Sequence, residues 1–314
     1  MRTPITSVST SVSGTTALTV GPLWRLLRPH QWVKNLLVLV PVVLAHRWGS
    51  HQILADALVG LLAFTLCASA TYVLNDLKDR HTDRLSLSKR SRPLADGSFP
   101  IRLAMPLAVL LGAAGLVVAA LCTPRLAALL ALYLLLNQAY THFIKQLVLL
   151  DVLALVLFYM LRIQAGGLAT GIVVSGWLLA FAACLFLSLA LAKRSAELSR
   201  LVKGTPATSL PGRSYRARDR GWVHCTGLVT GVGSIVVLAA YSFSPAMTAL
   251  YSTPWPLLLI CAVLLSWLLR TWHLAITGRL HDDPVVFATR DPASYLAGLV
   301  CIVLLAWASS ATIS

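Results

Sequence analysis

The chain has 314 residues, of which 57% are hydrophobic and only 12% are charged. A soluble domain carries about 25% charged residues, so this composition excludes an ordinary soluble globular protein. The formal net charge of +15 would suit a nucleic-acid-binding protein. The basic residues gather, however, in alternate loops between long apolar runs, which is typical of a polytopic membrane protein.

Residues 1–20 are rich in Ser and Thr and predict a disordered leader. The basic loops place the N-terminus in the cytoplasm and the C-terminus outside. The six cysteines form no Cys-x-x-Cys pair and are interpreted as small apolar residues, not as disulfides or a zinc site.

The apolar runs predict an all-α membrane protein with nine transmembrane helices. These lie at residues 33–45, 54–75, 103–122, 126–141, 148–169, 176–193, 222–243, 255–276 and 292–312.

Basic and aromatic residues surround the start of the first predicted span, in the sequence LRPHQWVKN. Arg28 and Lys34 lie here, together with Trp24 and Trp32. Such residues anchor helices at a membrane interface, and the cations can also bind a phosphate group. Both interpretations stay open for Arg28, whereas Lys34 is favoured as a phosphate ligand because it opens the span.

Three aspartates follow the second predicted span, in the stretch YVLNDLKDRHTDR. Asp76, Asp79 and Asp83 are spaced i, i+3 and i+7, which places them within about 60° on one helical face, with Asn75 at its edge. Clustered carboxylates repel one another in a medium of low dielectric constant, and a hard divalent cation such as Mg²⁺ relieves that repulsion. The alternative interpretation is a solvated helix end held by salt bridges.

The basic residues after this cluster favour the metal. Mg²⁺ rarely binds to protein ligands alone and prefers one or two carboxylates together with substrate phosphates. Lys89, Arg90 and Arg92 follow closely and can donate to phosphate oxygens. The pattern therefore predicts a site for Mg²⁺ and diphosphate at the cytoplasmic edge of the membrane.

These residues resemble a known family. NDLKDRHTDR followed by RPLADG is similar to the first signature of the UbiA superfamily of intramembrane prenyltransferases, N-D-x-x-D-x-x-x-D and R-P-L-x-x-G. The resemblance implies one catalytic transmembrane domain over residues 21–314, a helical bundle whose central cavity opens to the cytoplasm and laterally to lipid. It also implies that Asn75, Asp76, Asp79 and Asp83 bind Mg²⁺ and diphosphate, the three aspartates being the metal-binding catalytic residues.

The boundary between the fourth and fifth predicted spans carries further polar residues. Tyr140 and Lys145 lie there, either as interfacial residues or as substrate ligands. Asp151 lies about one turn inside an apolar run, where an ionisable residue predicts a functional site. Arg162 lies on the same helical face but about 16 Å deeper, too far to pair with Asp151, and a structural role is favoured for it.

The region after the sixth predicted span departs from the family's pattern. Typical members carry a second acidic motif, D-x-x-x-D, whereas this sequence reads LALAKRSAELSR. Lys193 and Glu197 are spaced i, i+4 and are expected to pair, which leaves Arg194 as the favoured phosphate ligand and Lys193 as the second. This half of the cavity is therefore expected to bind an anion and not a metal.

The last cytoplasmic loop reads HDDPVVFATRD, and its Asp282 and Asp283 are interpreted as ligands of a second metal, ligands of the ribose hydroxyls or caps of the ninth predicted span. Together, L-R-P-x-Q-W-x-K-N, K-R-x-A-E-L and D-D-P-V-x-F-A resemble the decaprenyl-phosphate phosphoribosyltransferase subgroup. That resemblance implies Mg²⁺-dependent transfer of 5-phosphoribose from phosphoribosyl diphosphate to a polyprenyl (decaprenyl) phosphate, in arabinan precursor synthesis for the cell wall. The expected partners are both substrates and the plasma-membrane bilayer, not nucleic acid, and a homo-oligomer stays open.

Two other functions stay open. The first is an aromatic prenyltransferase of quinone or haem biosynthesis with a polyprenyl diphosphate donor, against which the missing second D-x-x-x-D counts. The second is a carrier of polyprenyl-linked lipid that catalyses no reaction. Labelled substrates distinguish the two transferases, and Mg²⁺ dependence distinguishes an enzyme from a carrier.

Overall fold

The computed structural model describes residues 20–86, 89–204, 214–248, 250–251, 253–280 and 283–310. These residues form helices joined by turns and loops, with no strand among them, as the all-α prediction expects. The predicted leader, residues 1–20, lies outside the described residues except for Val20, which begins the first helix.

Four short elements come first, namely α1 (Val20–Leu27), α2 (Pro29–Trp32), η1 (Val33–Leu39) and α3 (Val40–Leu44). The long helices follow in the order α4 (His51–Leu85), α5 (Ile101–Cys122), α6 (Pro124–His142), α7 (Leu150–Thr170), α8 (Gly176–Gly204), α9 (Arg220–Ser242), α11 (Trp255–Ile276) and α13 (Pro292–Ser310). Shorter elements lie in the connections: η2 (Ile144–Gln146), η3 (Ala217–Asp219), α10 (Pro245–Thr248) and α12 (Pro284–Ala288).

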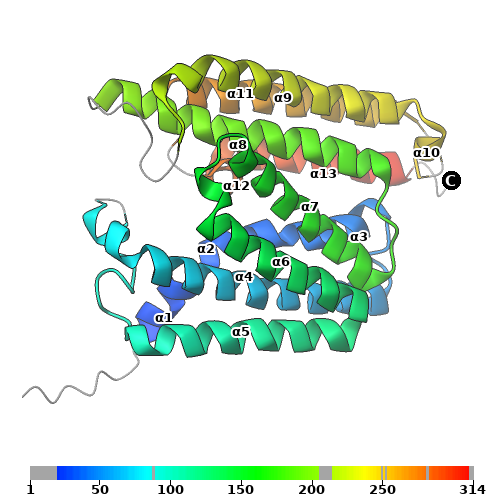
Figure 1. Cartoon of the computed structure of the whole chain (residues 1–314). Coiled ribbons are helices and arrows are strands. Elements are labelled where there is room, and N and C mark those ends of the chain that lie inside the picture. Colours follow the sequence, from blue (N-terminus) through cyan, green and yellow to red (C-terminus); the bar gives the residue numbers. More distant parts are fainter. Residues whose placement is uncertain are drawn as a thin grey trace, which may run out of the picture.

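The central helix of the bundle is α7. It contacts α4, α6, η1 and α8, and in Figure 1 it lies between two groups of helices. In one group α4 packs on α5, and in the other α8 packs on α9 and α11, with α13 against α11. The apolar stretch of α7 is 61% buried, more than that of any other candidate membrane helix among the described residues, because protein surrounds it.

Seven of the described helices are long and apolar enough to cross a membrane: α4, α5, α7, α8, α9, α11 and α13. The prediction of nine spans is therefore not confirmed. Residues 33–45 form η1 and α3, of 7 and 5 residues, which together extend only about 21 Å and fall short of a hydrocarbon core of about 30 Å. The 19-residue helix α6 is too polar near its end, where Asn137, Gln138 and His142 lie.

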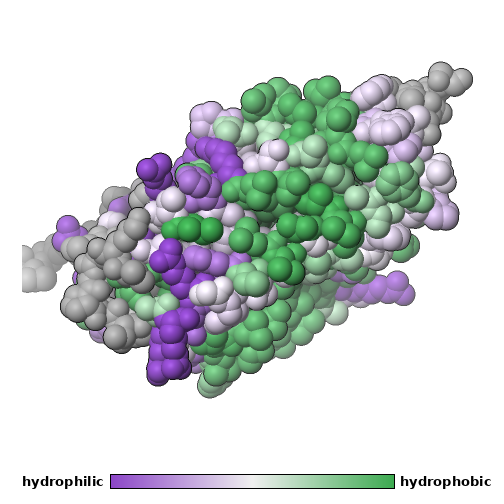
Figure 2. Space-filling model, turned by 90° about the horizontal axis from the view of Figure 1, so that it is seen from above, coloured by the Kyte–Doolittle hydropathy of each residue, from purple (hydrophilic) through white to green (hydrophobic). Residues whose placement is uncertain are grey.

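The outer surface of the long helices is apolar. Large hydrophobic side chains are exposed on α5 and α13, for example Leu110 at 66% and Ile302 at 65%. On the face shown in Figure 2, apolar residues form a broad continuous belt, and hydrophilic residues gather toward the two ends of the molecule. Soluble monomers do not expose apolar patches of this extent, so the chain is an integral membrane protein.

A close backbone contact holds η1 against the centre of the bundle. A Cβ atom at Gly166 of α7 would lie 1.9 Å from the carbonyl oxygen of Val38 in η1. Only glycine allows two backbones to approach this closely. The contact positions the amino-terminal part of η1, which carries Lys34 and Asn35, beside the middle of the bundle.

Candidate active site

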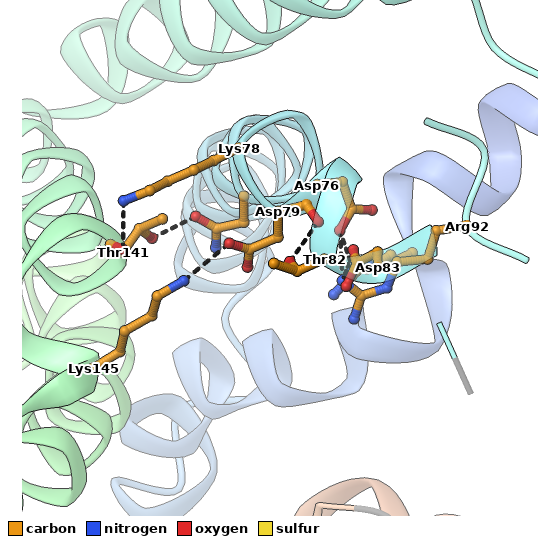
Figure 3. Close-up of polar contacts among 10 residues, drawn as sticks. Asp76, Lys78, Asp79, Thr82, Asp83, Arg92, Thr141 and Lys145 are labelled. Atoms are coloured by element: carbon orange, nitrogen blue, oxygen red, sulfur yellow. Dashed lines mark hydrogen bonds and ion pairs between the residues drawn. The ribbon is translucent and has the colours of Figure 1, made fainter. Parts of the chain in front are cut away.

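The three predicted metal ligands lie on one helix. α4 continues to Leu85, past the predicted end at residue 75, so Asp76, Asp79 and Asp83 share its last turns. The side chains of Asp76 and Asp83 are buried, whereas Asp79 is partly exposed. Figure 3 shows the three carboxylates among basic side chains that come from other parts of the chain.

Two arginines contact the buried carboxylates. Arg28, at the junction of α1 and α2, forms an ion pair with Asp76. The Nη1 atom of Arg92 lies 3.1 Å from Oδ1 of Asp76 and 2.6 Å from Oδ2 of Asp83, so this guanidinium bridges the pair (Figure 3). The structure thus brings two of the predicted phosphate-binding residues to the acidic cluster.

The backbone of Arg28 adopts an unusual conformation. Its φ of 54° and ψ of 60° are left-handed, and it directly precedes Pro29, which disfavours the right-handed helical conformation for the residue before it. Burial lowers the pKa of the Arg28 guanidinium, and the nearby Asp76 carboxylate acts in the opposite direction. Strained residues of this kind are common at ligand sites, where the surrounding structure holds them in place.

The remaining acidic-cluster residues contact the end of α6 and η2. Nζ of Lys145 lies 3.0 Å from Oδ1 of Asp79. The hydroxyl of Thr141 donates to the amide oxygen of Asn75, and Lys78 donates to the Thr141 carbonyl at 2.9 Å (Figure 3). Lys145, which the sequence left open as an interfacial residue or a substrate ligand, therefore contacts the cluster, and Thr141 is a contact that the sequence did not predict.

The two other predicted cations after α4 lie in the turn that leads to Arg92. Lys89 and Arg90 are exposed there. Of the three predicted cations in this segment, Figure 3 labels Arg92, beside Asp76 and Asp83. The role of Lys89 and Arg90 as phosphate ligands stays a prediction.

The oxygen donors of the acidic cluster suit a hard divalent cation. Oδ2 of Asp76 is buried and has no hydrogen-bond partner among the described residues. The same residues contain no group of three or more His, Cys, Asp or Glu side chains arranged around a metal position, because the three aspartates are turned toward arginines and a lysine. The chain thus offers one or two carboxylates to an ion that takes its other ligands from phosphate, the environment that Mg²⁺ prefers.

A second charged group, which we call the Asp283 cluster, consists of Lys34, Tyr159, Lys193 and Asp283. Oδ2 of Asp283 lies 3.0 Å from Nζ of Lys34 and 3.1 Å from Nζ of Lys193. Oδ1 accepts hydrogen bonds from the Tyr159 hydroxyl at 3.3 Å and from the backbone N–H of Val285 at 3.2 Å. Burial raises the pKa of Asp283, but the two ammonium groups outweigh it and hold that pKa below its usual range.

The contacts of Lys193 and Arg194 correct the sequence analysis. Glu197 pairs with Arg194 and not with Lys193. The Arg194 side chain is fully buried, and its Nε atom lies 2.8 Å from Oδ2 of Asp151, whose Oδ1 accepts from Tyr140 at 2.8 Å. Arg194 and Asp151 are therefore enclosed by protein, and their role as substrate ligands stays a prediction.

Arg162 joins several elements at the centre of the bundle. Its guanidinium donates to Asn35 Oδ1 at 3.0 Å and to the Phe158 carbonyl at 2.6 Å. Its Cζ atom lies 5.0 Å from the ring centre of Phe64 and 5.6 Å from that of Tyr133. These contacts fit the structural role favoured for Arg162, and they connect η1 to α7.

Two site residues were missed or left undecided for a physical reason. Thr141 and Tyr159 are ordinary residue types for a membrane helix, and neither stands in a motif. Their significance comes from contacts with Asn75 and Asp283, which are distant in the sequence. Asp283, for which three roles were open, caps the short helix α12 and not the ninth predicted span, and it pairs with two lysines. Asp282 lies outside the described residues.

An apolar cavity of about 380 Å³ lies away from both charged groups. Pro41, Ser175, Tyr241 and Leu305 are among its lining residues, which include none of the predicted site residues. It therefore contributes no polar group to the candidate active site.

Comparisons with known proteins agree on one family. The model of the UbiA prenyltransferase family matches residues 36–290. Nodulation protein NoeC of Azorhizobium caulinodans is 35% identical over 284 residues, covering 89% of this chain and 89% of that protein. Decaprenyl-phosphate phosphoribosyltransferase of Mycobacterium tuberculosis is 30% identical over 287 residues, covering 90% of this chain and 92% of that enzyme.

Another relative is much longer than this chain. Protein y4nM of Sinorhizobium fredii is 36% identical over 273 residues, which cover 87% of this chain but only 53% of that protein. The chain thus spans about half of its length. Among solved structures, a UbiA homolog from Archaeoglobus fulgidus bound to GPP and Mg²⁺ has a TM-score of 0.64 at 19% identity, covering 91% of this chain and 98% of the other. At that identity the likeness shows the fold alone.

Proposed function

Because this chain belongs to the UbiA prenyltransferase family, we propose that it transfers 5-phosphoribose from phosphoribosyl diphosphate to a polyprenyl phosphate. The observation that carries the proposal is the division of cations between two sites. Arg28 and Arg92 lie beside the acidic cluster, and Lys34 and Lys193 form the Asp283 cluster. A reaction between two phosphate-bearing substrates needs two anion sites, and the relative named decaprenyl-phosphate phosphoribosyltransferase supports this choice.

The acidic cluster is the proposed donor site. Asp76, Asp79 and Asp83, with Asn75, would hold Mg²⁺, which when bound neutralises the diphosphate and eases its departure. Arg28 and Arg92 contact these carboxylates. Guanidinium groups bind phosphate oxygens in a bidentate manner, so both arginines are placed to take hold of the diphosphate when it enters.

The Asp283 cluster is the proposed acceptor site, where Lys34 and Lys193 bind the phosphate of the polyprenyl phosphate. An oxygen of that phosphate forms the new bond to C1 of the ribose. The bond from C1 to the diphosphate oxygen breaks, and the diphosphate leaves with the electron pair. The attacking oxygen is already anionic at neutral pH, so the transfer needs no general base.

Lys145, Tyr140 and the exposed pair Lys89 and Arg90 complete the proposed surroundings of the donor. Lys145 pairs with Asp79, and the Tyr140 hydroxyl donates to the Asp151 carboxylate at 2.8 Å.

We also propose that the N-terminus and both charged sites face the cytoplasm and that the C-terminus lies outside. Reporter fusions at residue 314 and at the N-terminus test that orientation.

The alternative is a transferase that moves a prenyl group from a polyprenyl diphosphate to an aromatic acceptor. The solved homolog bound to GPP and Mg²⁺ shares the fold of this chain, and this likeness is an argument for the alternative. The two lysines of the Asp283 cluster count against it. An aromatic hydroxyl brings no negative charge that two lysines would need to bind, and it would be better activated by a base.

A transfer assay in membranes decides between them. Membranes containing the protein receive radiolabelled phosphoribosyl diphosphate, Mg²⁺ and a polyprenyl phosphate, and the lipid fraction is counted. We expect Mg²⁺-dependent label in the lipid, and we expect Lys34→Gln to raise the KM for the acceptor. Label appearing only with prenyl diphosphate and an aromatic acid would establish the alternative. Lipid movement that persists in Asp76→Asn without Mg²⁺ would point to a carrier.

A further inference from the structure

We propose that Asp283 is a resident anion, which occupies the phosphate position between Lys34 and Lys193 until the acceptor arrives and so controls which anion binds there. The identity of the acceptor, a polyprenyl phosphate, rests on the proposed function. The role of Asp283 as an internal competitor for the two lysines is a separate claim, which can be tested without any transfer reaction.

The geometry of the Asp283 cluster resembles that of a bound oxyanion. The two ammonium groups come from different elements, Lys34 from η1 and Lys193 from α8, and both reach the same oxygen, Oδ2 of Asp283, at 3.0 and 3.1 Å. The side chains of Lys34 and Asp283 are each 14% exposed, and that of Lys193 is 28% exposed. These partly exposed side chains therefore share a single anion position.

The charges explain why an anion has to be present. Two ammonium groups that share one position repel each other strongly where water is scarce. Asp283 reduces the charge of the group from two positive units to one. A phosphate monoester can replace it, since its several oxygens accept from both lysines at once.

The two oxygens of Asp283 have different partners, which allows an exchange. Oδ1 is held by Tyr159 and by the backbone N–H of Val285, where it caps α12, whereas Oδ2 contacts the lysines. The ammonium groups of Lys34 and Lys193, which stand at the ends of flexible side chains, can therefore leave Oδ2 while Oδ1 stays in place and keeps the cap of α12. An incoming phosphate takes the place of one carboxylate oxygen without unfolding the loop.

This arrangement gives Asp283 a role in specificity. Without the Asp283 carboxylate, Lys34 and Lys193 would also bind the diphosphate of the donor, which carries more charge than the acceptor phosphate. An internal carboxylate lowers the affinity of this position for every free anion. A polyprenyl phosphate has an additional source of binding energy in its apolar chain, and the donor has none, so with the resident anion present the acceptor still binds here at concentrations where the donor does not.

The test measures anion binding to the purified protein in detergent. Equilibrium dialysis with radiolabelled inorganic pyrophosphate, without Mg²⁺ and without substrates, compares the wild type with Asp283→Asn. Asn is as good a helix cap as Asp, so α12 keeps its cap while the charge is removed. We expect the variant to bind pyrophosphate at least about tenfold more tightly, because two unmasked lysines attract it.

Three further variants make the result specific. Asp283→Ser also keeps the cap and should show the same gain, which provides the answer if Asp283→Asn does not fold. Asp283→Asn combined with Lys193→Gln should lose the gain. Asp291→Asn is the matched control, since Asp291 follows α12 and pairs with Arg270 at 2.7 and 2.8 Å, outside the Asp283 cluster, and its pyrophosphate affinity should equal that of the wild type.

The outcomes separate this inference from the proposed function. Unchanged pyrophosphate affinity in a folded Asp283→Asn or Asp283→Ser protein would overturn the resident anion, and so would an equal gain in Asp291→Asn. A gain that depends on Lys193 supports it, even if no phosphoribose is transferred in the membrane assay. In that case the acceptor is another anionic lipid, and the proposed function alone fails.

Discussion

Nε of Arg194 lies 2.8 Å from Oδ2 of Asp151, and both side chains are completely buried. This ion pair joins α8 to the first turn of α7. Its neighbours are Glu197, which also contacts Arg194, and Tyr140, which donates to Asp151. The pair therefore holds together, from inside the protein, the two helices that carry Tyr159 and Lys193 of the Asp283 cluster.

The first prediction concerns this pair. Asp151→Asn leaves the buried Arg194 guanidinium with an incomplete set of partners, which should destabilise the protein by about 3 kcal/mol. Thermal unfolding in detergent should show a lower Tm, while the KM for the donor should stay unchanged. Replacing both partners, in Asp151→Leu with Arg194→Met, should restore most of the Tm. A changed KM at an unchanged Tm would instead place Asp151 in the substrate site.

The second prediction concerns the metal. Asp76→Asn should reduce turnover by about 10²–10³-fold, because a carboxylate that helps hold Mg²⁺ against the leaving diphosphate is lost. Titration of Mg²⁺ against the initial rate checks this, and removal of the metal with a chelator should abolish the wild-type activity reversibly. Asp56→Asn, near the other end of the same helix, is the matched control. Equal losses in both variants would mean that charge on α4, and not metal binding, is responsible.

The third prediction concerns the contact between α7 and η1. A methyl group at Gly166 would lie 1.9 Å from the Val38 carbonyl oxygen, so Gly166→Ala should push η1 outward. Overpacking of this kind costs about 1–3 kcal/mol and would move Lys34 with η1. We expect a lower Tm and a higher KM for the acceptor. Gly176→Ala is the control, because nothing lies within 4 Å of its added Cβ atom, and it should change neither quantity.

The fourth prediction concerns acid stability. The pKa of Asp283 is held below its usual range by Lys34 and Lys193, although burial acts in the opposite direction. A carboxyl group with a lowered pKa in the folded state contributes stability that is present above its unfolded pKa of about 4 and is lost as the pH falls further. The Tm of the wild type should therefore drop between about pH 4.5 and pH 3.

Scanning calorimetry or fluorescence at a series of pH values measures this drop. It should be smaller in Asp283→Asn, which has no titrating group at this position. Asp291→Asn retains Asp283 and should keep most of the drop. If Asp283→Asn lost as much stability in acid as the wild type, the two lysines would not be stabilising the carboxylate.

Local features of the site were predictable because a helix has a fixed period. The spacing of Asp76, Asp79 and Asp83 placed them on one helical face, and the structure has all three on α4. The long apolar runs likewise predicted membrane helices, although the short η1 and α3 and the polar end of α6 left seven candidates and not nine.

Pairings between distant residues were predicted less well. The i, i+4 rule favoured Glu197 as the partner of Lys193, yet Lys193 bonds to Asp283, 90 positions away, and Glu197 bonds to Arg194. The rule describes an isolated helix in water. In the bundle, α12 brings a carboxylate to Lys193, and Asp151 draws the Arg194 side chain inward.

The sequence by itself determined that this is an all-helical membrane protein with an acidic helix face near a basic loop, because composition and helical periodicity are local properties. Its motifs also resembled those of one family. Only the tertiary structure decided which cation neutralises which carboxylate. Arg28 with Asp76, and Lys34 and Lys193 with Asp283, are pairs assembled from separate elements. The strength of such a pair depends on distance and on exclusion of water, and both arise only when the helices pack together.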